Sequence, residues 1–188
     1  MEKLKYSPVE YSLGDIKMRK LHILIVLLIV VMTVTIPVSY IVASKLAQDT
    51  VVYGIGFSAQ PATVNTEAAR ATLSTIFNLE NRGDTVITFD ANIIVWINPV
   101  ENHSFTGDVE FSVQPVTQEH YYIGNVTVEN ARAPPHGHAE VPGNFEIVAE
   151  DALNVIRSGN FHVAWSTYAV AVTGSYLGWQ ITTSPAFM

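Results

Sequence analysis

The sequence predicts an all-β fold: an antiparallel, immunoglobulin-like β-sandwich of about seven or eight strands with one short helix, preceded by a single transmembrane α-helix. The first observation is the uncharged run 21–43. At a helical rise of about 1.5 Å per residue the run is about 35 Å long, enough to cross a hydrocarbon core of about 30 Å. The second is that most later segments alternate apolar and polar residues with a period of two, which is typical of half-buried strands. The third is one short segment, 149–157, with its apolar residues at helical spacing.

The run 21–43 has two interpretations, a retained membrane anchor and a signal peptide. A signal peptide usually has an apolar region of about 7 to 15 residues that ends at a small-residue cleavage motif. Here the run is longer and continues through 43–47, so we favour the anchor. Lys17, Arg19 and Lys20 lie directly before the run, and only Lys45 lies close after it. The positive-inside rule then makes 1–20 a cytoplasmic tail and puts the rest of the chain outside the cytoplasm.

The predicted localisation is therefore the cell membrane, single-pass, with lipid as the partner of 21–43. The chain has a formal net charge of −7, and its acidic residues lie mostly after the run. This acidity argues against nucleic acid and anionic lipid headgroups as partners of the external part. The chain has no cysteine, which excludes a thiol nucleophile, a disulfide and cysteine-bound zinc.

The external part divides into a connecting segment, 44–67, and a β-sandwich domain, 68–188. The connecting segment has its own predicted strand, because Val51, Tyr53, Ile55 and Phe57 alternate with smaller residues. The runs 71–80 and 85–97 alternate most clearly. They are joined by the turn-forming residues 81–84, and so predict a long hairpin with one buried side.

Further strands are predicted at 109–114, 122–129, 161–173 and 176–182. In the predicted strand 122–129, Tyr122, Val126 and Val128 share the buried face. The run 161–173 is almost continuously apolar, which is typical of a central strand buried on both faces. The segment 149–157 begins with acidic residues and ends with Arg157 before Ser158-Gly159, so it predicts a short helix between two strands.

The order of features over 68–187 resembles the late embryogenesis abundant group-two family, also called the water stress and hypersensitive response domain. Those domains have a long early strand that ends in an Asn-Pro-Asn turn. Here TVITFDANIIVWINPV has that form, with Asn98-Pro99 at the turn and Val100 in place of the second asparagine. They continue with a strand, a glycine and a loop into another strand, then a short helical stretch and a strand ending near glycine, as in EDALNVIRSGNFHVAWSTYAVAVTG. The resemblance implies a binding or protective role and no enzyme activity.

The most chemically suggestive segment is 134–138, in which His136 and His138 flank a glycine after two prolines. Two such imidazoles are able to bind one copper or zinc ion. Further candidates to complete the ligands are His103, His120 and His162. Pro-Pro-x-Gly is also typical of a simple exposed loop, so the sequence gives weak metal candidates and no predicted cofactor.

Other candidate sites are sparse. Glu101, Asp108 and Glu110 surround one predicted loop, but they lack the alternating carboxylates and glycine of a calcium loop, so solvated charge is favoured. No serine lies in a G-x-S-x-G elbow. Two N-glycosylation sequons begin at Asn102 and Asn125.

The leading functional hypothesis is a non-catalytic, membrane-anchored protein whose external sandwich binds protein or envelope partners or protects against stress. One alternative is an accessory or structural subunit of a membrane or surface-filament assembly. A second is a copper or zinc site centred on His136 and His138.

Overall fold

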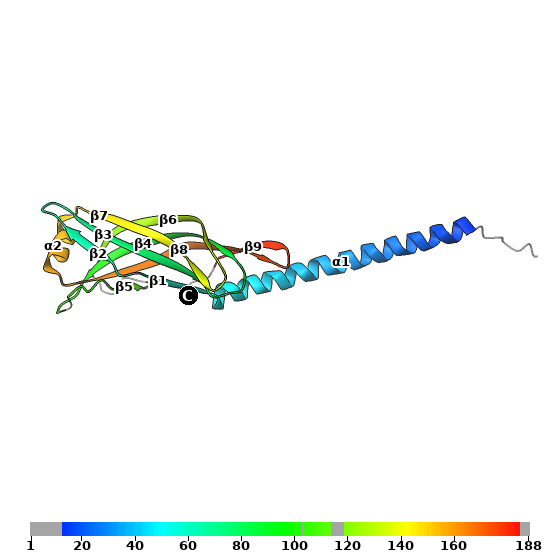
Figure 1. Ribbon diagram of the computed structural model, residues 1–188, viewed down its shortest axis with the longest axis horizontal. Helices are drawn as coiled ribbons and strands as arrows, with labels where there is room; N and C mark the ends of the chain where they lie inside the picture. The colour runs from blue at the N-terminus through cyan, green and yellow to red at the C-terminus, as the bar shows by residue number, and fades with distance from the viewer. Residues whose placement is uncertain (1–12, 103, 114–118, 185–188) are drawn as a thin grey trace, which may run out of the picture. The chain divides into compact units, whose positions relative to one another are not determined.

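The computed structural model describes residues 13–102, 104–113 and 119–184, and it divides the chain into two compact units (Figure 1). The first unit is Met1–Val42 and the second is Ala43–Met188. The second unit contains all nine strands of the described residues and the short helix.

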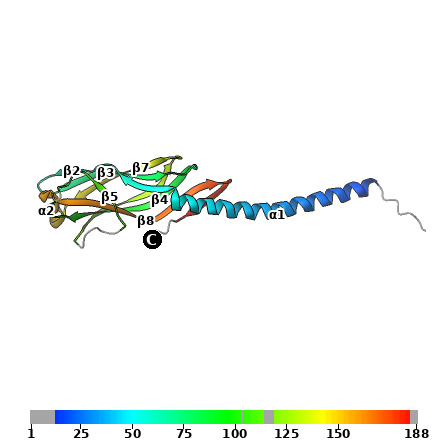
Figure 2. The ribbon, with the colours of Figure 1, turned by 90° about the horizontal axis from the view of Figure 1, so that it is seen from below.

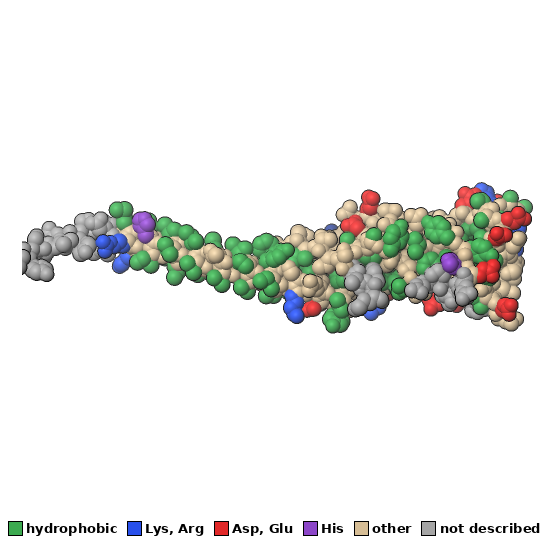
Figure 3. All heavy atoms as spheres, turned by 180° about the vertical axis from the view of Figure 1, so that it is seen from behind, with side chains coloured by type: hydrophobic (Ala, Val, Ile, Leu, Met, Phe, Trp, Pro, Cys, Tyr) green, Lys and Arg blue, Asp and Glu red, His purple; other side chains and the backbone are tan. Residues whose placement is uncertain are grey.

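Helix α1, Leu13–Tyr53, contains the whole of the predicted membrane run. Its stretch Met18–Tyr53 is long and apolar enough to cross a membrane, and an 18-residue window of it has a mean hydropathy of 2.8, as is true of both anchors and signal sequences. Hydrophobic side chains cover the apolar part of α1 all around, and basic side chains lie at its N-terminal end (Figure 3). The hydroxyls of Thr33 and Thr35 donate to the carbonyls of Ile29 and Val31, so these polar groups are satisfied within the helix.

The last turns of α1 are part of the second unit. Ala43, Ala47 and Val51 follow one another at a spacing of four, which puts them on one face of the helix. They are 0%, 1% and 5% exposed. The predicted strand through Val51 and Tyr53 is therefore wrong in its first part, because helix continues to Tyr53 and strand β1 begins at Ile55. The alternation of 51–57 fits both a strand and the end of an amphipathic helix.

The first sheet has four strands: β1 (Ile55–Ala59), β2 (Thr63–Thr66), β3 (Ala71–Asn81) and β7 (Gly137–Ile147). Strand β3 lies in the middle, with β7 along one side and β1 and β2 one after the other along the opposite side. Pro61 lies between β1 and β2, where it interrupts what is otherwise one edge strand.

The second sheet has five strands: β4 (Ile87–Pro99), β5 (Val109–Phe111), β6 (Tyr121–Ala133), β8 (Phe161–Tyr176) and β9 (Trp179–Thr183). Strand β4 lies between β6 and β8, and β5 and β9 pair with opposite ends of β8. All pairings are antiparallel except that of β5 with β8. The central position of β8 agrees with its sequence, since Val163–Thr167 are buried without a break.

One hydrophobic core lies between the two sheets. The ribbon views show the two sheets as layers of the second unit (Figures 1 and 2). Its centre is Trp165 of β8, which is fully buried. The ring centroid of Trp165 is 4.7 Å from that of Phe77 in the first sheet and 5.0 Å from that of Phe111 in its own. Helix α2 (Glu150–Ser158) buries Ala152, Leu153 and Ile156 in this core, as its helical spacing requires. It ends at Gly159, whose φ of 73° is left-handed, so the predicted helix and its stop are confirmed.

The predicted hairpin of 71–80 and 85–97 is wrong in its pairing. Both strands form, and the alternating burial of β3 is complete from Ala71 to Asn81. However, β3 and β4 belong to different sheets, so the turn between them crosses the sandwich. Alternation shows which face is buried but not which strand is the neighbour. The alternation pattern also missed β2 and β7, although the family resemblance implied a strand after the loop, where β7 lies. The pattern did not include the parallel β5–β8 pair.

Tyr122 is another error of the predicted pattern, since its side chain is exposed while Val128 is buried. The register changes from Val95 opposite Gly124 to Trp96 opposite Tyr122, so Ile123 is one extra residue in β6. A β-bulge of this kind reverses the alternation beyond it. The period-two pattern is therefore correct on one side of the bulge only.

One edge of the first sheet is β7, and proline occupies a position on it. The carbonyl of Ile76 accepts from Gln60 N at 2.8 Å, so the backbone groups of Ile76 point towards β1 and β2. Its partner in β7 is Pro142, which must then point its own backbone groups away from β3, because the two residues form a non-hydrogen-bonded pair. Most residues at position 142 would present an outward N–H, but proline has no backbone N–H. Proline on an edge strand is a known protection against edge-to-edge pairing.

Replacing Pro142 with valine restores an outward N–H at this edge. We expect the free energy of unfolding to change by less than about 1 kcal/mol, because no ladder bond is lost, while association on heating increases. Light scattering during thermal unfolding of the detergent-solubilised chain measures this. Asn144→Val is the matched control, since it adds the same side chain to the same exposed face without a new donor. Equal scattering by the two variants would show that the edge donor is irrelevant.

Candidate functional site

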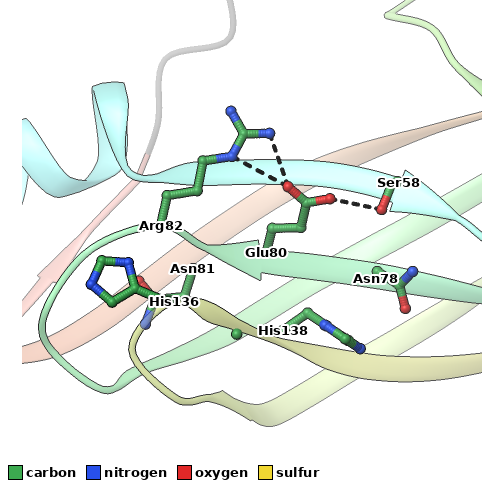
Figure 4. A pocket seen from close by; sticks show the side chains of 8 residues that line it. Ser58, Asn78, Glu80, Asn81, Arg82, His136 and His138 are labelled. Carbon is green, nitrogen blue, oxygen red and sulfur yellow. Dashed lines mark hydrogen bonds and ion pairs between the residues drawn. The ribbon is translucent and has the colours of Figure 1, made fainter.

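The candidate site is an open cavity of about 280 Å³ on the outer face of the first sheet, where β1, β3 and β7 lie side by side (Figure 4). Its lining residues are Ser58, Asn78, Glu80, Asn81, Arg82, His136, Gly137 and His138. The strand register explains why they meet. Gly56, Glu80 and His138 are consecutive partners across the three strands, and so are Ser58, Asn78 and Glu140.

Glu80 is the centre of this site. Its Oε1 accepts from the hydroxyl of Ser58 at 2.8 Å, and its Oε2 accepts from Nη2 of Arg82 at 2.9 Å. The hydrogen bond from Arg82, with the one from Ser58, holds the pKa of Glu80 below its usual range, although partial burial opposes this. The carboxylate is therefore charged and poorly basic at neutral pH.

Gly56 makes room for this arrangement. A Cβ at Gly56 would lie 2.6 Å from both Nη2 of Arg82 and Oε2 of Glu80. Glycine at this strand position thus allows the ion pair to lie across the backbone of β1. A side chain there would displace the guanidinium, because the Arg82 side chain is the more exposed partner.

Asn81 fixes the floor of the site. It is 1% exposed, and its Nδ2 donates to the carbonyls of Thr85, Ala133 and Pro134 at 2.8, 3.2 and 2.9 Å. Its Oδ1 accepts from Gly83 N at 3.0 Å. The side-chain amide of Asn81 therefore joins the β3–β4 connection to the β6–β7 turn. His136 lies in that turn, and His138 follows it in β7.

His136 and His138 lie at this site but have separate carboxylate partners. Nε2 of His136 is 2.8 Å from Oδ1 of Asp84, and Nε2 of His138 is 3.4 Å from Oε1 of Glu140. His138 belongs to strand β7 rather than to the expected loop. Among the described residues, no group of three or more His, Asp or Glu is placed to hold a metal ion.

The other histidines do not join them. His162 lies beside Asn98 at the end of β4, 3.3 Å from Glu110, whereas Gly137 pairs with Asn81 just before β4 begins. His120 precedes β6 where it pairs with the same far end of β4. His103 lies outside the described residues.

The two sequon asparagines are both exposed. Asn102 has a φ of 60° in the turn after β4, and its sequon includes His103, outside the described residues. Asn125 lies on the outer face of β6 as expected, where its Oδ1 accepts from the hydroxyl of Tyr122 at 3.0 Å. The carboxylates of Glu101, Asp108 and Glu110 are exposed too, and that of Asp108 accepts from Thr106 at 2.7 Å.

Ser58 is not activated as a nucleophile in this arrangement. A serine nucleophile needs a base that takes its proton, and Ser58 donates to a carboxylate whose pKa is lowered by Arg82. What the site presents is an open surface with a carboxylate, a guanidinium, amide groups and imidazoles side by side. Sequence reasoning identified His136 and His138 but missed Ser58, Glu80 and Arg82. The turn at 81–84 was the only signal near them.

The fold and this surface define a chain with a long apolar N-terminal helix and a two-sheet β-domain that presents a polar, open site. Neither the comparison with protein-family models nor the comparison with curated proteins finds a match for it.

Asn81→Asp keeps the size of the side chain but places a carboxylate against three carbonyl oxygens. We expect the free energy of unfolding to fall by about 3 kcal/mol, because buried acceptors lose their donor and a charge is buried. Chemical denaturation of the solubilised chain measures the change. Asn144→Asp, on the exposed face of β7, is the matched control and should change it by less than about 0.5 kcal/mol.

Glu80 makes stability depend on pH in one direction. Because its folded pKa is lowered, its contribution is complete above the unfolded pKa and is lost as the pH falls through the folded value. Glu80→Gln should thus destabilise the chain at pH 7, by about 1 kcal/mol or less since Arg82 is exposed, and the difference should vanish in acid. Melting temperatures across pH test this, with Glu129→Gln on the exposed face of β6 as control. A difference that does not shrink as the pH falls below the ordinary glutamate pKa of about 4.3 would contradict the role of this charge.

Proposed function

We propose that this chain is a single-pass membrane protein whose β-domain lies outside the cytoplasm and acts by binding rather than by catalysis. The observation that carries the proposal is the burial of Ala43, Ala47 and Val51 in the second unit. A signal peptide is removed from the mature chain, and removal of these residues would expose the surface that they cover. Retention of the helix is the alternative that keeps the domain intact.

The orientation rests on the basic residues before the apolar run. Lys17, Arg19 and Lys20 favour a cytoplasmic N-terminus, and the acidic domain then faces the exterior. With this orientation the sequons at Asn102 and Asn125 are on the side where glycosylation takes place, and both side chains are exposed as that modification requires.

We further propose that the sandwich is immunoglobulin-like. In that fold the first, second and fifth strands A, B and E are neighbours in one sheet, and C, F and G are neighbours in the other. Here the interrupted β1/β2, β3 and β7 are neighbours in the positions of strands A, B and E. Strands β4, β8 and β9 are neighbours in the positions of C, F and G. Strand β6 extends the second sheet beside β4, as strand C′ does in variable-type domains.

We also propose that the β-domain is related to the water stress and hypersensitive response domain. Three features support it: β4 is long and ends at Asn98-Pro99, helix α2 stands between β7 and β8, and β8 continues to a glycine near its end. A binding or protective role in the cell envelope is what this resemblance implies. The open polar site around Glu80 is the surface we assign to such binding.

The assembly alternative is favoured by β6. This strand runs from Tyr121 to Ala133 and pairs, among the described residues, with β4 along one side only. A partner strand is able to add to such an edge. A glycan on Asn125 of the same strand would oppose it, so the native mass of the detergent-extracted chain, with and without glycan, separates a monomer from a subunit.

The principal test is the mature chain itself. Intact mass from membranes should include 21–43, and protease added to intact cells should cut the domain but spare the N-terminal tail. Ala47→Asp should lower the free energy of unfolding by about 3 kcal/mol, because it buries a charge, whereas Gln48→Asp on the exposed side should change it little. A mature chain that begins after Ala47 would refute the anchor.

A further inference from the structure

The hairpin between β8 and β9 has an unusual tip. Its two turn residues, Leu177 and Gly178, both have positive φ, 51° and 83°, which defines the primed turn that favours Asn-Gly. A large apolar residue is disfavoured at the first of these positions because its Cβ is crowded. Leu177 is nevertheless there, and its side chain is 62% exposed. The domain itself therefore gains little from this leucine.

The base of the same hairpin packs on the last turns of α1. Tyr176 and Ile181 are buried in one small cluster with Ala43 and Ala47, and Trp179 packs against that cluster. All five residues belong to the second unit. The small alanine side chains let the helix approach the hairpin closely, as small residues do in helix contacts.

The height of the hairpin relative to a bilayer follows from Ala43. The uncharged run ends there, and its helical length of about 35 Å exceeds a hydrocarbon core of about 30 Å by a few ångströms. Ala43 then lies in the headgroup layer on the outer side, and Ala47 lies about 6 Å further out. Side chains that pack on these two alanines lie in the same layer, however the first unit is oriented.

We propose that the tip of the β8–β9 hairpin is a second membrane contact, with Leu177 and Trp179 inserted in the interfacial layer of the bilayer that α1 spans. The occupant of this apolar tip is lipid of the chain's own membrane, and the inference rests on the proposed function. Tryptophan and tyrosine are enriched at this depth, where the ring is apolar and the polar edge reaches water. Trp179, which is only partly buried, supplies such a ring at the hairpin.

Tryptophan fluorescence tests the contact directly. The chain has three tryptophans, and Trp96 and Trp165 are buried in the domain at 3% and 0% exposure. Trp179 is the one whose ring is only partly buried. The full chain is reconstituted in phosphatidylcholine vesicles whose acyl chains carry bromine either near the headgroup or near the bilayer centre. We expect stronger quenching by the shallow bromine, and we expect Trp179→Phe to remove most of it.

Leu177→Asn separates the membrane role of the tip from its structural role. Asparagine suits the positive φ, so the melting temperature should stay the same or rise, while quenching of Trp179 should fall at least about twofold because the apolar tip is lost. Val148→Asn is the matched control: this valine is as exposed as Leu177 but follows β7, and its replacement should leave quenching unchanged.

Vesicle flotation distinguishes the two proposals. If the chain floats with the vesicles but bromine does not quench Trp179, the hairpin contact is wrong and the anchor stands. If the chain does not float, both proposals are wrong. If Leu177→Asn lowers the melting temperature and leaves quenching unchanged, the tip is structural and the membrane contact is overturned.

Discussion

The structure depends on one helix face that belongs to the folded domain. Along most of α1 the apolar side chains are exposed, in a stretch long and apolar enough to cross a membrane. From Ala43 onward the same helix buries one face against protein, through residues spaced by four. The side chains change from large branched residues to alanine where this happens. Because Val51 reaches the main core, the helix end and the sandwich form one packed unit.

Polar organisation in the domain follows from the strand register. Strand β3 gives alternate residues to the core, and its outward residues, Asn78 and Glu80, meet outward residues of β1 and β7. Gly56 provides the space and Arg82 provides the charge that keeps Glu80 ionised. Asn81, like Thr75, is a polar residue at an inward position of β3, and its side chain is satisfied by three carbonyls and one N–H. The site is thus a consequence of one strand lying between two others.

The sequence predicts the elements well and their neighbours poorly. The burial pattern of β3, the central position of β8 and the stop of α2 at Gly159 depend on local periodicity and local backbone preference, and each is confirmed. Which strand pairs with which depends on contacts between distant residues, so the crossing from β3 to β4 and the parallel β5 were missed. The candidate site shows the same division. His136 and His138 stand out in the sequence, whereas Glu80 becomes central only when Ser58 and Arg82 are brought to it by the fold.

The packing of the β8–β9 hairpin on α1 also determines the order in which the chain completes its fold during synthesis. The helix is made first, yet the residues that cover Ala43 and Ala47 are Tyr176 and Ile181, almost at the end of the chain. Contacts between such distant residues form late, because the intervening chain must be ordered first. A polypeptide released before β8 is complete would retain an uncovered alanine face on α1. This gives the cell a chemical difference between full-length and truncated products that quality-control proteases and chaperones are able to detect.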